Sequence, residues 1–345
     1  MRLANHPAIE VRDLVMQFPQ QQGWKALFKR EPGKMALRGI NLTIPTGEIF
    51  GMLGPNGAGK TTLIKVLTTL TIPSSGEALV TGLDVVKSSI EVRSRVGVVY
   101  GDERTFFWRL SAFDNLLFYA ALYHIPEKQA RRRAAELLEM VGLREAMHLR
   151  MHHYSSGMKQ RASIARGLLN DPDILIMDEP TRSLDPIAAQ ELRRLVKDRV
   201  ADGQRTVLVA TNIMAEAEYL CDRIAFINRG QIQLVGEIED LRGILQSEEK
   251  HELVAGGVSL AAVECLRTLP GVDAMNVATD QDGRVRLGLT VRREMPVMPT
   301  VVRAIVDLGG DVWSSTPSEL TLDEMFSIVV EKSQAVTGLR EKVPV

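Results

Sequence analysis

The sequence predicts an α/β fold followed by a second, smaller α+β domain. Three observations support this prediction. Residues Gly54–Thr62 read G-P-N-G-A-G-K-T-T, which matches the phosphate-binding loop pattern G-x-x-x-x-G-K-[ST]. The apolar stretch Ile174–Met177 ends in two carboxylates, at the strand end where open α/β sheets place chemistry. Beyond about Leu245 the pattern changes, so we expect one domain over 1–245 and another over 246–345.

Length and composition limit the classes of protein to consider. A chain of 345 residues is long enough for about two domains, and contents of 45% hydrophobic and 25% charged residues are ordinary for a soluble globular protein. The net charge of −1 argues against a nucleic-acid binder, so we expect no nucleic-acid partner. Cys221 and Cys265 are far apart and indicate neither a disulfide framework nor a cysteine metal site.

No apolar run approaches the roughly 18 residues of a membrane-spanning helix. The first residues also lack the apolar core of a signal peptide. We therefore expect a cytoplasmic protein, and any membrane spans it works with would belong to another chain.

The first two predicted strands are Ile9–Val15, which alternates like a half-buried strand, and Ala36–Ile44. Phe18 follows the first of them. An aromatic ring here would stack on an adenine base, a contact that contributes about 1 to 3 kcal/mol, or it is simply an aromatic at a strand end. The residue pattern leaves both interpretations open.

The phosphate loop has the strand, loop and helix context that its pattern requires. Gly47–Leu53 reads as a buried strand, and Thr61–Leu67 has apolar positions at helical spacing. Glycines let backbone N–H groups turn inward around an anion at the positive end of the helix, which favours a polyphosphate. Lys60 would then reach the β- and γ-phosphates, and the Thr61 hydroxyl would ligate Mg²⁺. The expected phosphate-binding residues are Gly54, Pro55, Asn56, Gly57, Ala58, Gly59, Lys60, Thr61 and Thr62.

The middle of the chain is mainly helical. After strands at Glu77–Val80 and Arg95–Tyr100, the pattern from Ala112 to Val141 is helical, and its arginine run indicates a solvated face. Three histidines then follow at helix-like spacing, but with no fourth ligand nearby they favour no metal site. They are His148, His152 and His153.

A helix is expected to begin at Ser155, which is a good N-cap residue. The next strand ends in Asp178 and Glu179. Beside a phosphate loop these carboxylates suggest a Mg²⁺ ligand and a general base, Asp178 for the metal and Glu179 for polarising a water. A further strand, Arg205–Ala210, leads to Asn212.

The C-terminal region alternates as β, α, β, β, α, β, the order of a split βαβ or ferredoxin-like domain. A helix over Thr321–Glu331 closes it. The expected elements are His251–Ala255, Ser259–Leu269, Gly271–Ala278, Arg284–Thr290, Pro299–Leu308 and Asp311–Ser315.

Over about residues 9 to 243 the order and spacing of these motifs resemble the ATP-binding subunit of an ABC transporter. The resemblance implies a P-loop NTPase cassette with a RecA-like core, an antiparallel β subdomain and a helical subdomain at about 102–165. It also implies that ATP lies between two cassettes arranged head to tail. The implied roles are adenine stacking for Phe18, Walker A for Gly54–Thr62, signature turn for Ser155 and Gly157, catalytic base for Glu179 and D-loop for Asp185.

The resemblance also implies a working partner. The interval from Lys60 to Ser155 is too short for the long coiled coil of chromosome-maintenance ABC ATPases. The C-terminal region, which includes Ser318–Phe326, looks like the accessory domain of export-type subunits for drugs, lipids or polysaccharides. We therefore expect an export permease as partner and a peripheral location on the inner face of the cell membrane. Phe106–Trp108 with Ala112–Tyr123 would form the groove that receives a permease helix or, alternatively, the core of the helical subdomain.

Three positions depart from the family pattern. The signature L-S-G-G-Q appears as Tyr154–Met158, which keeps the serine and the last glycine. The glutamine of the Q-loop is replaced by Asp102, which would ligate Mg²⁺ or simply cap a turn. The switch histidine is replaced by Asn212, whose amide can hydrogen-bond a phosphate but carries no proton or positive charge.

These departures suggest that ATP binding is retained and that turnover is slow. Asp102 and Asn212 belong to the half of the ATP site that contains this chain's own Walker A loop. The expected catalytic glutamate of that half, Glu179, is present. The second cassette is then either an identical chain or a different, more standard one. An alternative class is a nucleotide-dependent switch or regulatory subunit with little hydrolysis, and a soluble ABC protein acting on nucleic acid is disfavoured by the charge.

Overall fold

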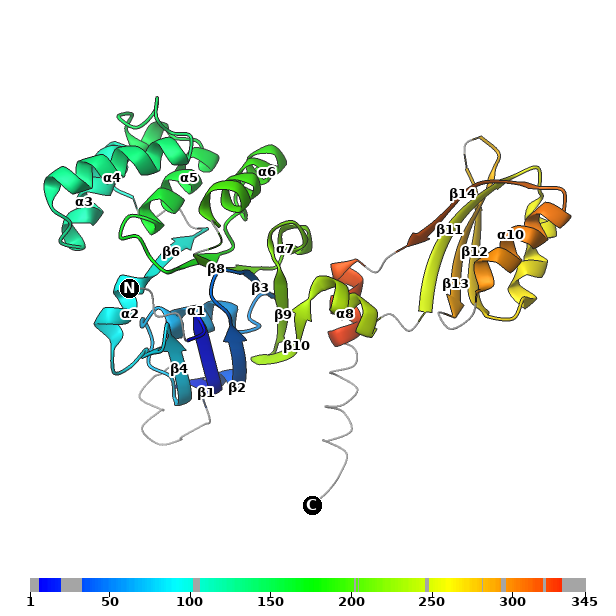
Figure 1. Cartoon of the computed structure of the whole chain (residues 1–345), viewed down its shortest axis with the longest axis horizontal. Coiled ribbons are helices and arrows are strands. Elements are labelled where there is room, and N and C mark those ends of the chain that lie inside the picture. Colours follow the sequence, from blue (N-terminus) through cyan, green and yellow to red (C-terminus); the bar gives the residue numbers. More distant parts are fainter. Residues whose placement is uncertain are drawn as a thin grey trace, which may run out of the picture. The chain divides into compact units, whose positions relative to one another are not determined.

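The computed structural model describes residues 6–19, 33–101, 106–201, 203, 205–245, 248–280, 282–292, 296–318 and 321–330. The chain forms two compact units, the first over Met1–Ile238 with Val329–Val345 and the second over Glu239–Ile328. Figure 1 shows their elements. Asp102 lies outside the described residues. Within the described part of the chain, no helix has the length and apolar character needed to cross a membrane.

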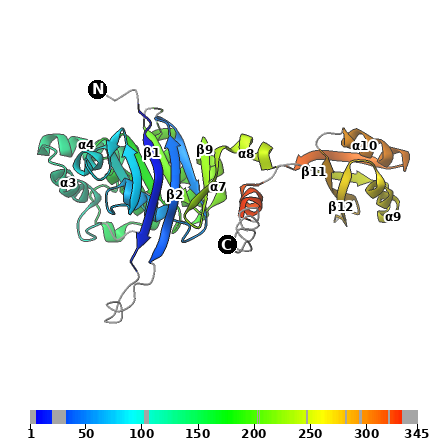
Figure 2. The ribbon, with the colours of Figure 1, turned by 90° about the horizontal axis from the view of Figure 1, so that it is seen from below.

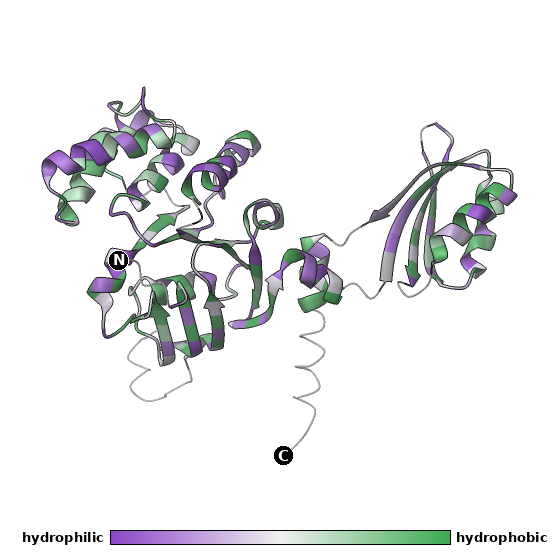
Figure 3. Ribbon diagram, viewed as in Figure 1, coloured by the Kyte–Doolittle hydropathy of each residue, from purple (hydrophilic) through white to green (hydrophobic). Residues whose placement is uncertain are grey.

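The first unit is built on a six-stranded sheet in the order β10-β9-β3-β8-β7-β6, parallel except for the edge strand β10. Its central strands are buried at every position, as expected where a parallel sheet is covered on both faces. Figure 3 shows them as largely hydrophobic. The strands are β3 (Ile49–Leu53), β6 (Val96–Tyr100), β7 (Ile174–Asp178), β8 (Thr206–Thr211), β9 (Arg223–Asn228) and β10 (Gln231–Glu237).

A second sheet of the first unit is antiparallel, in the order β2-β1-β4-β5. Figure 2 shows β1 and β2 side by side. Helix α1 (Lys60–Leu67) contacts β2, β4 and β7, so it lies between the two sheets, and its buried face joins one continuous apolar core. The strands are β1 (Ile9–Phe18), β2 (Lys34–Ile44), β4 (Ser75–Val80) and β5 (Leu83–Asp84), and α2 (Ser89–Arg95) follows them.

The helical part of the first unit contains the stretch from Ala112 to Val141 that was predicted to be helical. It forms two helices, α3 (Ala112–Leu122) and α4 (Glu127–Met140). His124 between them has φ of 56° and Pro126 caps α4. A proline disfavours helical backbone at the residue before it, so the break falls here. The neighbouring helices are η2 (Met151–His153), α5 (Ser156–Gly167), α6 (Pro186–Leu195), the π-helical turn η3 (Val196–Val200) and α7 (Met214–Leu220).

The second unit contains a four-stranded antiparallel sheet in the order β12-β13-β11-β14, with the predicted alternation of strands and helices along the chain. Strand β13 alternates buried and exposed residues, and its buried side chains join those of α10 in one core. The elements are α8 (Ile238–Leu245), β11 (Glu248–Gly256), α9 (Leu260–Val263), η4 (Glu264–Thr268), β12 (Val272–Thr279), β13 (Val285–Arg292), α10 (Val297–Asp307) and β14 (Asp311–Ser318). A helix over 322–330 follows.

Candidate functional site

The phosphate loop leaves the buried strand β3 at Gly54 and enters α1 at Lys60. Gly57 and Gly59 have φ of 81° and 116°, a left-handed backbone that glycine adopts without strain. A side chain at Gly54 would meet the carbonyl oxygen of Ile227 at 2.2 Å, so this position must also be glycine. The loop therefore takes the backbone form that its sequence pattern predicted.

Lys60 folds back over this loop. Its Nζ donates to the carbonyl oxygens of Gly54, at 2.5 Å, and Pro55, at 3.2 Å, and the side chain is buried. Burial lowers the pKa of Lys60, whereas the negative charges of Glu179 and Asp178 oppose that shift. The ammonium group is thus the positive charge of the loop and faces two carboxylates.

Thr61 and Asp178 meet at the start of α1. The Thr61 hydroxyl donates to Oδ2 of Asp178 at 3.0 Å, while Oδ1 of Asp178 is buried without a hydrogen-bond partner among the described residues. Burial raises the pKa of Asp178. Hydroxyl and carboxylate oxygens are the ligands that Mg²⁺ prefers, so these two residues fit a magnesium ion.

Glu179 follows β7 with φ of 50°, a left-handed conformation that costs a non-glycine residue about 1 to 3 kcal/mol. Its N–H donates to the carbonyl oxygen of Ala210 in β8, at 2.8 Å. Its carboxylate accepts a hydrogen bond from Arg182 at 2.8 Å. Because of this left-handed conformation, the backbone at Glu179 leaves the extended path of β7 at the carboxyl edge of the sheet.

Asn212 lies at the same edge. Strand β8 pairs in parallel with β3 and β7, with Thr211 opposite Leu53 and Ala210 opposite Asp178. The ends of three strands therefore bring together the phosphate loop, the two carboxylates and Asn212, which is exposed. This cluster contains both residues predicted to be catalytic.

The predicted signature and D-loop residues lie together elsewhere. Ser155 caps α5 by accepting from the N–H of Met158, at 3.2 Å, and Asp185 caps α6 by accepting from two N–H groups. A side chain at Gly157 would meet Ala188 of α6 at 3.3 Å. Because α5 contacts α3, α4, α6 and β6, whereas α1 contacts β2, β4 and β7, the two helices pack against different elements. In the described part of the chain, the main contacts of the signature turn's helix are therefore with other elements than those of the phosphate-loop helix.

The comparisons with known proteins cover the same residues. Residues 37–182 match the family described as ABC transporter. Over 298 residues the chain is 35% identical to the daunorubicin resistance ATP-binding protein DrrA3 of Streptomyces coeruleorubidus, covering 86% of this chain and 92% of that relative. The chain belongs to the ABC transporter ATP-binding proteins. The cassette is also 35% identical over 244 residues to the linearmycin resistance ATP-binding protein LnrL of Bacillus subtilis, covering 71% and 78% of the two chains.

Solved ABC cassettes have the same fold. The structure of cbiO1 from Clostridium perfringens, part of the ABC transporter complex cbiONQ, aligns with TM-score 0.59 and 28% identity over 69% of this chain and 92% of its own. The dimeric structure of MJ0796, a bacterial ABC transporter cassette, aligns with TM-score 0.57 and 25% identity over 67% and 98%. The predicted family and its P-loop α/β fold are thereby confirmed.

Phe18 is partly exposed at the end of β1, where it pairs with Lys34 at the start of β2. A side chain at Gly59 would meet the carbonyl oxygen of Ala36 in β2 at 2.9 Å. The start of β2 therefore lies beside both Phe18 and the phosphate loop, and stacking of Phe18 on an adenine stays a prediction.

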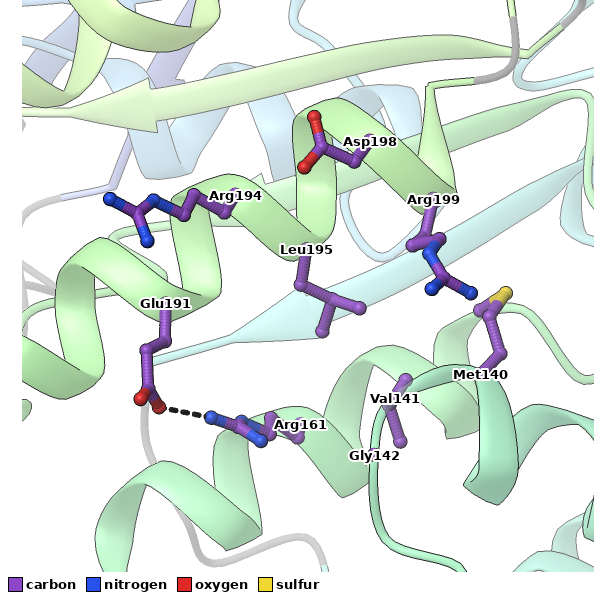
Figure 4. Close-up of a pocket in the computed structure, with 9 residues that line it drawn as sticks. All are labelled: Met140, Val141, Gly142, Arg161, Glu191, Arg194, Leu195, Asp198 and Arg199. Atoms are coloured by element: carbon purple, nitrogen blue, oxygen red, sulfur yellow. Dashed lines mark hydrogen bonds and ion pairs between the residues drawn. The ribbon is translucent and has the colours of Figure 1, made fainter.

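A pocket of about 230 Å³ lies between helices of the cassette (Figure 4). Across it, Arg161 of α5 forms an ion pair with Glu191 of α6. The pair ties the helix that begins at Ser155 to the helix that Asp185 caps. The lining residues are Met140, Val141, Gly142, Arg161, Glu191, Arg194, Leu195, Asp198 and Arg199.

We expect the Arg161–Glu191 pair to couple α5 and α6 by no more than about 1 kcal/mol, since exposed pairs are weakened by solvent screening. The relative exposures of the two side chains are 27% and 53%. Arg161→Gln, Glu191→Gln and the double variant, compared by urea denaturation, measure this coupling. The matched control is Arg132–Glu136 on α4, at 3.6 Å and with both side chains more than half exposed. A coupling well above about 1 kcal/mol would contradict this expectation, and a coupling no larger than that of the control would show that the pair does not hold the two helices together.

Sequence reasoning missed one residue at this edge of the sheet. Glu216 of α7 is fully buried behind Glu179 and Thr211. A glutamate in a short helix suggests a solvated position, and no local pattern indicated otherwise.

Proposed function

We propose that this chain is the ATP-binding and ATP-hydrolysing subunit of an ABC exporter. The observation that carries the proposal is the convergence of Lys60, Thr61, Asp178 and Glu179 at one sheet edge of an ABC cassette. Its similarity to drug-resistance ATP-binding proteins supports export.

The chain's own residues would bind ATP in three ways. Backbone N–H groups of Gly57–Thr62 would surround the phosphates at the N-terminus of α1, and Lys60 would exchange its two carbonyl acceptors for phosphate oxygens. Phe18 would stack on the adenine. Thr61 and Asp178 would hold Mg²⁺, which would offset the negative charge of the phosphates.

Hydrolysis would depend on Glu179. Its carboxylate would orient a water molecule for in-line attack on the γ-phosphate and would accept the proton that the water loses. The Asn212 amide would donate a hydrogen bond to the γ-phosphate from the neighbouring strand end. Because an amide carries no positive charge, it would stabilise the developing charge less than a protonated histidine, so turnover would be slow.

A second cassette would complete the site. Ser155 and Gly157 lie at an exposed helix start on elements other than those around the phosphate loop, and Asp185 caps the adjacent helix. We propose that they meet the ATP bound to another cassette in a head-to-tail dimer. The dimeric structure of the MJ0796 cassette supports pairing with a second cassette.

The helical part of the cassette would receive the permease. The side chains of Ala112, Leu116 and Ala120 on α3 are buried, whereas Trp108 is 71% and Leu122 is 60% exposed. Two further exposed rings, Phe107 and Phe118, pack together with their centroids 4.8 Å apart, and exposed apolar side chains that gather in this way mark interaction sites. Through this contact the cassette would sit on the inner face of the membrane.

Turnover of ATP by the purified protein, with and without Mg²⁺, tests the proposal. Mg²⁺-dependent phosphate release that saturates with ATP is the expected result. ATP binding without release would favour the alternative function, a nucleotide-dependent switch, which the exposed Asn212 at the histidine position specifically supports. Absence of ATP binding would contradict both functions.

We expect Asn212→His to raise kcat several-fold, by about 1 kcal/mol of transition-state stabilisation, because it restores a charge-assisted hydrogen bond to the γ-phosphate. The gain should grow as the pH falls from 8 toward 6.5, since the imidazolium fraction increases. Asn212→Gln keeps an amide and serves as the matched control. Equal kcat for the histidine variant and the native protein over this range would show that Asn212 does not limit turnover.

A further inference from the structure

Glu216 is a carboxylic acid with 0% relative exposure on α7. Neither of its oxygens makes a hydrogen bond of normal geometry with any residue that the structure describes. Buried carboxylates are almost always paired, and an unsatisfied one in a native protein calls for an explanation. Helix α7 contacts α6, β3 and β8, so the carboxyl group faces the inside of the cassette.

Two threonine hydroxyls face this carboxyl group. Burial raises the pKa of Glu216, and the nearby hydroxyls of Thr211 and Thr181 oppose the shift. The Thr181 hydroxyl is itself buried without a described hydrogen-bond partner, and that of Thr211 accepts from the N–H of Ile213 at 3.0 Å. Both threonines therefore retain a hydroxyl hydrogen that can be donated to the carboxyl group.

The charged and titratable groups around Glu216 come from several elements. Arg193 of α6 opposes the raised pKa and Glu179 adds to it. The buried thiol of Cys221 also faces the carboxyl group, which helps to raise the pKa of that thiol. Burial is the largest influence on the raised pKa of Glu216, and glutamine is the closest uncharged side chain of the same size and shape.

The two threonines belong to the segments that carry the proposed chemistry. Thr181 lies two residues after Glu179, and Thr211 directly precedes Asn212. The only described hydrogen bond from the Glu179 N–H joins these segments through the carbonyl oxygen of Ala210. The left-handed backbone of Glu179 persists only where the surrounding structure holds it. Glu216 lies where a single side chain can hold both segments.

We propose that Glu216 is a positioning residue, whose carboxyl group binds the hydroxyls of Thr181 and Thr211 and so holds Glu179 and Asn212 in one geometry. This inference rests on the proposed ATP hydrolysis. Hydrogen bonds of this kind are often long in free enzymes and tighten in the substrate complex. The benefit thus appears in turnover, whereas burial of the acid opposes folding.

Because the carboxyl group is proposed to aid turnover while its burial opposes folding, Glu216→Leu should change kcat and the melting temperature in different ways. Leucine fills the site with apolar atoms and removes the cost of burying a carboxyl group, so the melting temperature should stay equal or rise. At the same time kcat should fall about tenfold to a hundredfold, because displacing a catalytic group by even about 1 Å is that costly, while KM for ATP changes little. Glu216→Gln should keep at least about half of the native kcat, since its amide oxygen can accept from one threonine hydroxyl while its NH2 group donates to the oxygen of the other. Glu218→Gln, at an exposed position on the same helix, is the matched control and should not change kcat.

A double-mutant cycle decides the case if the leucine variant does not fold. Glu216→Ala, Thr181→Val and their combination should reduce kcat less than additively, because they remove one contact. Native kcat in Glu216→Leu, an equal loss in Glu216→Gln, or full additivity in the cycle would overturn the inference while leaving the proposed function intact. A native protein that binds MgATP without hydrolysing it would overturn the proposed hydrolysis, and this inference with it.

Discussion

Glu179→Gln is expected to reduce kcat for ATP hydrolysis by at least about a hundredfold, because a positioned general base contributes 10² to 10⁴ in rate. Glutamine keeps the size of the side chain but cannot take the proton of the attacking water. The affinity for MgATP should change little, since no proposed binding contact is lost. Phosphate release under saturating ATP, together with the affinity for ATP by calorimetry, checks both expectations. ATP-bound dimer should also accumulate, and size-exclusion chromatography would detect it.

The control for this substitution is Arg182→Ala. Glu179 accepts a hydrogen bond from Arg182, whose side chain is 67% exposed, so losing that pair alone should alter stability very little. A large loss in the glutamine variant with near-native turnover in the arginine variant would assign the effect to the base. Similar losses in both variants would show that Glu179 acts by holding Arg182, and native turnover in Glu179→Gln would contradict the mechanism.

The phosphate loop could be predicted from the sequence because the residues that determine its backbone lie next to one another in the chain. Gly57 and Gly59 are needed for backbone angles within the loop, and β3 reads as buried from its own residues. The break between α3 and α4 also has a local cause, since Pro126 marks it within the stretch that was predicted to be helical. These features depend on neighbours in the chain.

The surroundings of Glu179 depend on contacts distant in the chain and were beyond sequence reasoning. Its left-handed backbone is unusual for a non-glycine residue and is held by a hydrogen bond to β8. The burial of Glu216 results from the packing of α7 against α6, β3 and β8, which no pattern within seven helical residues can reveal. The sequence therefore identified the groups that are proposed to bind ATP, and the fold was needed to identify the group packed behind them.

Lys60→Met is expected to weaken ATP binding by roughly 10- to 150-fold, because hydrogen bonds to a charged group contribute about 1.5 to 3 kcal/mol. Methionine retains most of the buried stem and removes only the ammonium group. Lys60 has its pKa lowered by burial, so removing its charge also removes a desolvation cost, and the melting temperature should not fall. Calorimetric titration with MgATP and thermal denaturation measure the two effects.

Lys65→Met is the matched control, since Lys65 is exposed in the last turn of the same helix. Its affinity for ATP should equal that of the native protein. The melting temperature distinguishes binding of phosphate from support of the loop, because the Nζ of Lys60 also donates to the carbonyl oxygens of Gly54 and Pro55. Weaker binding with an unchanged melting temperature would assign the lysine to the phosphates. Weaker binding accompanied by a lower melting temperature would instead mean that the ammonium group acts by holding the loop, and unchanged binding would remove Lys60 from the site.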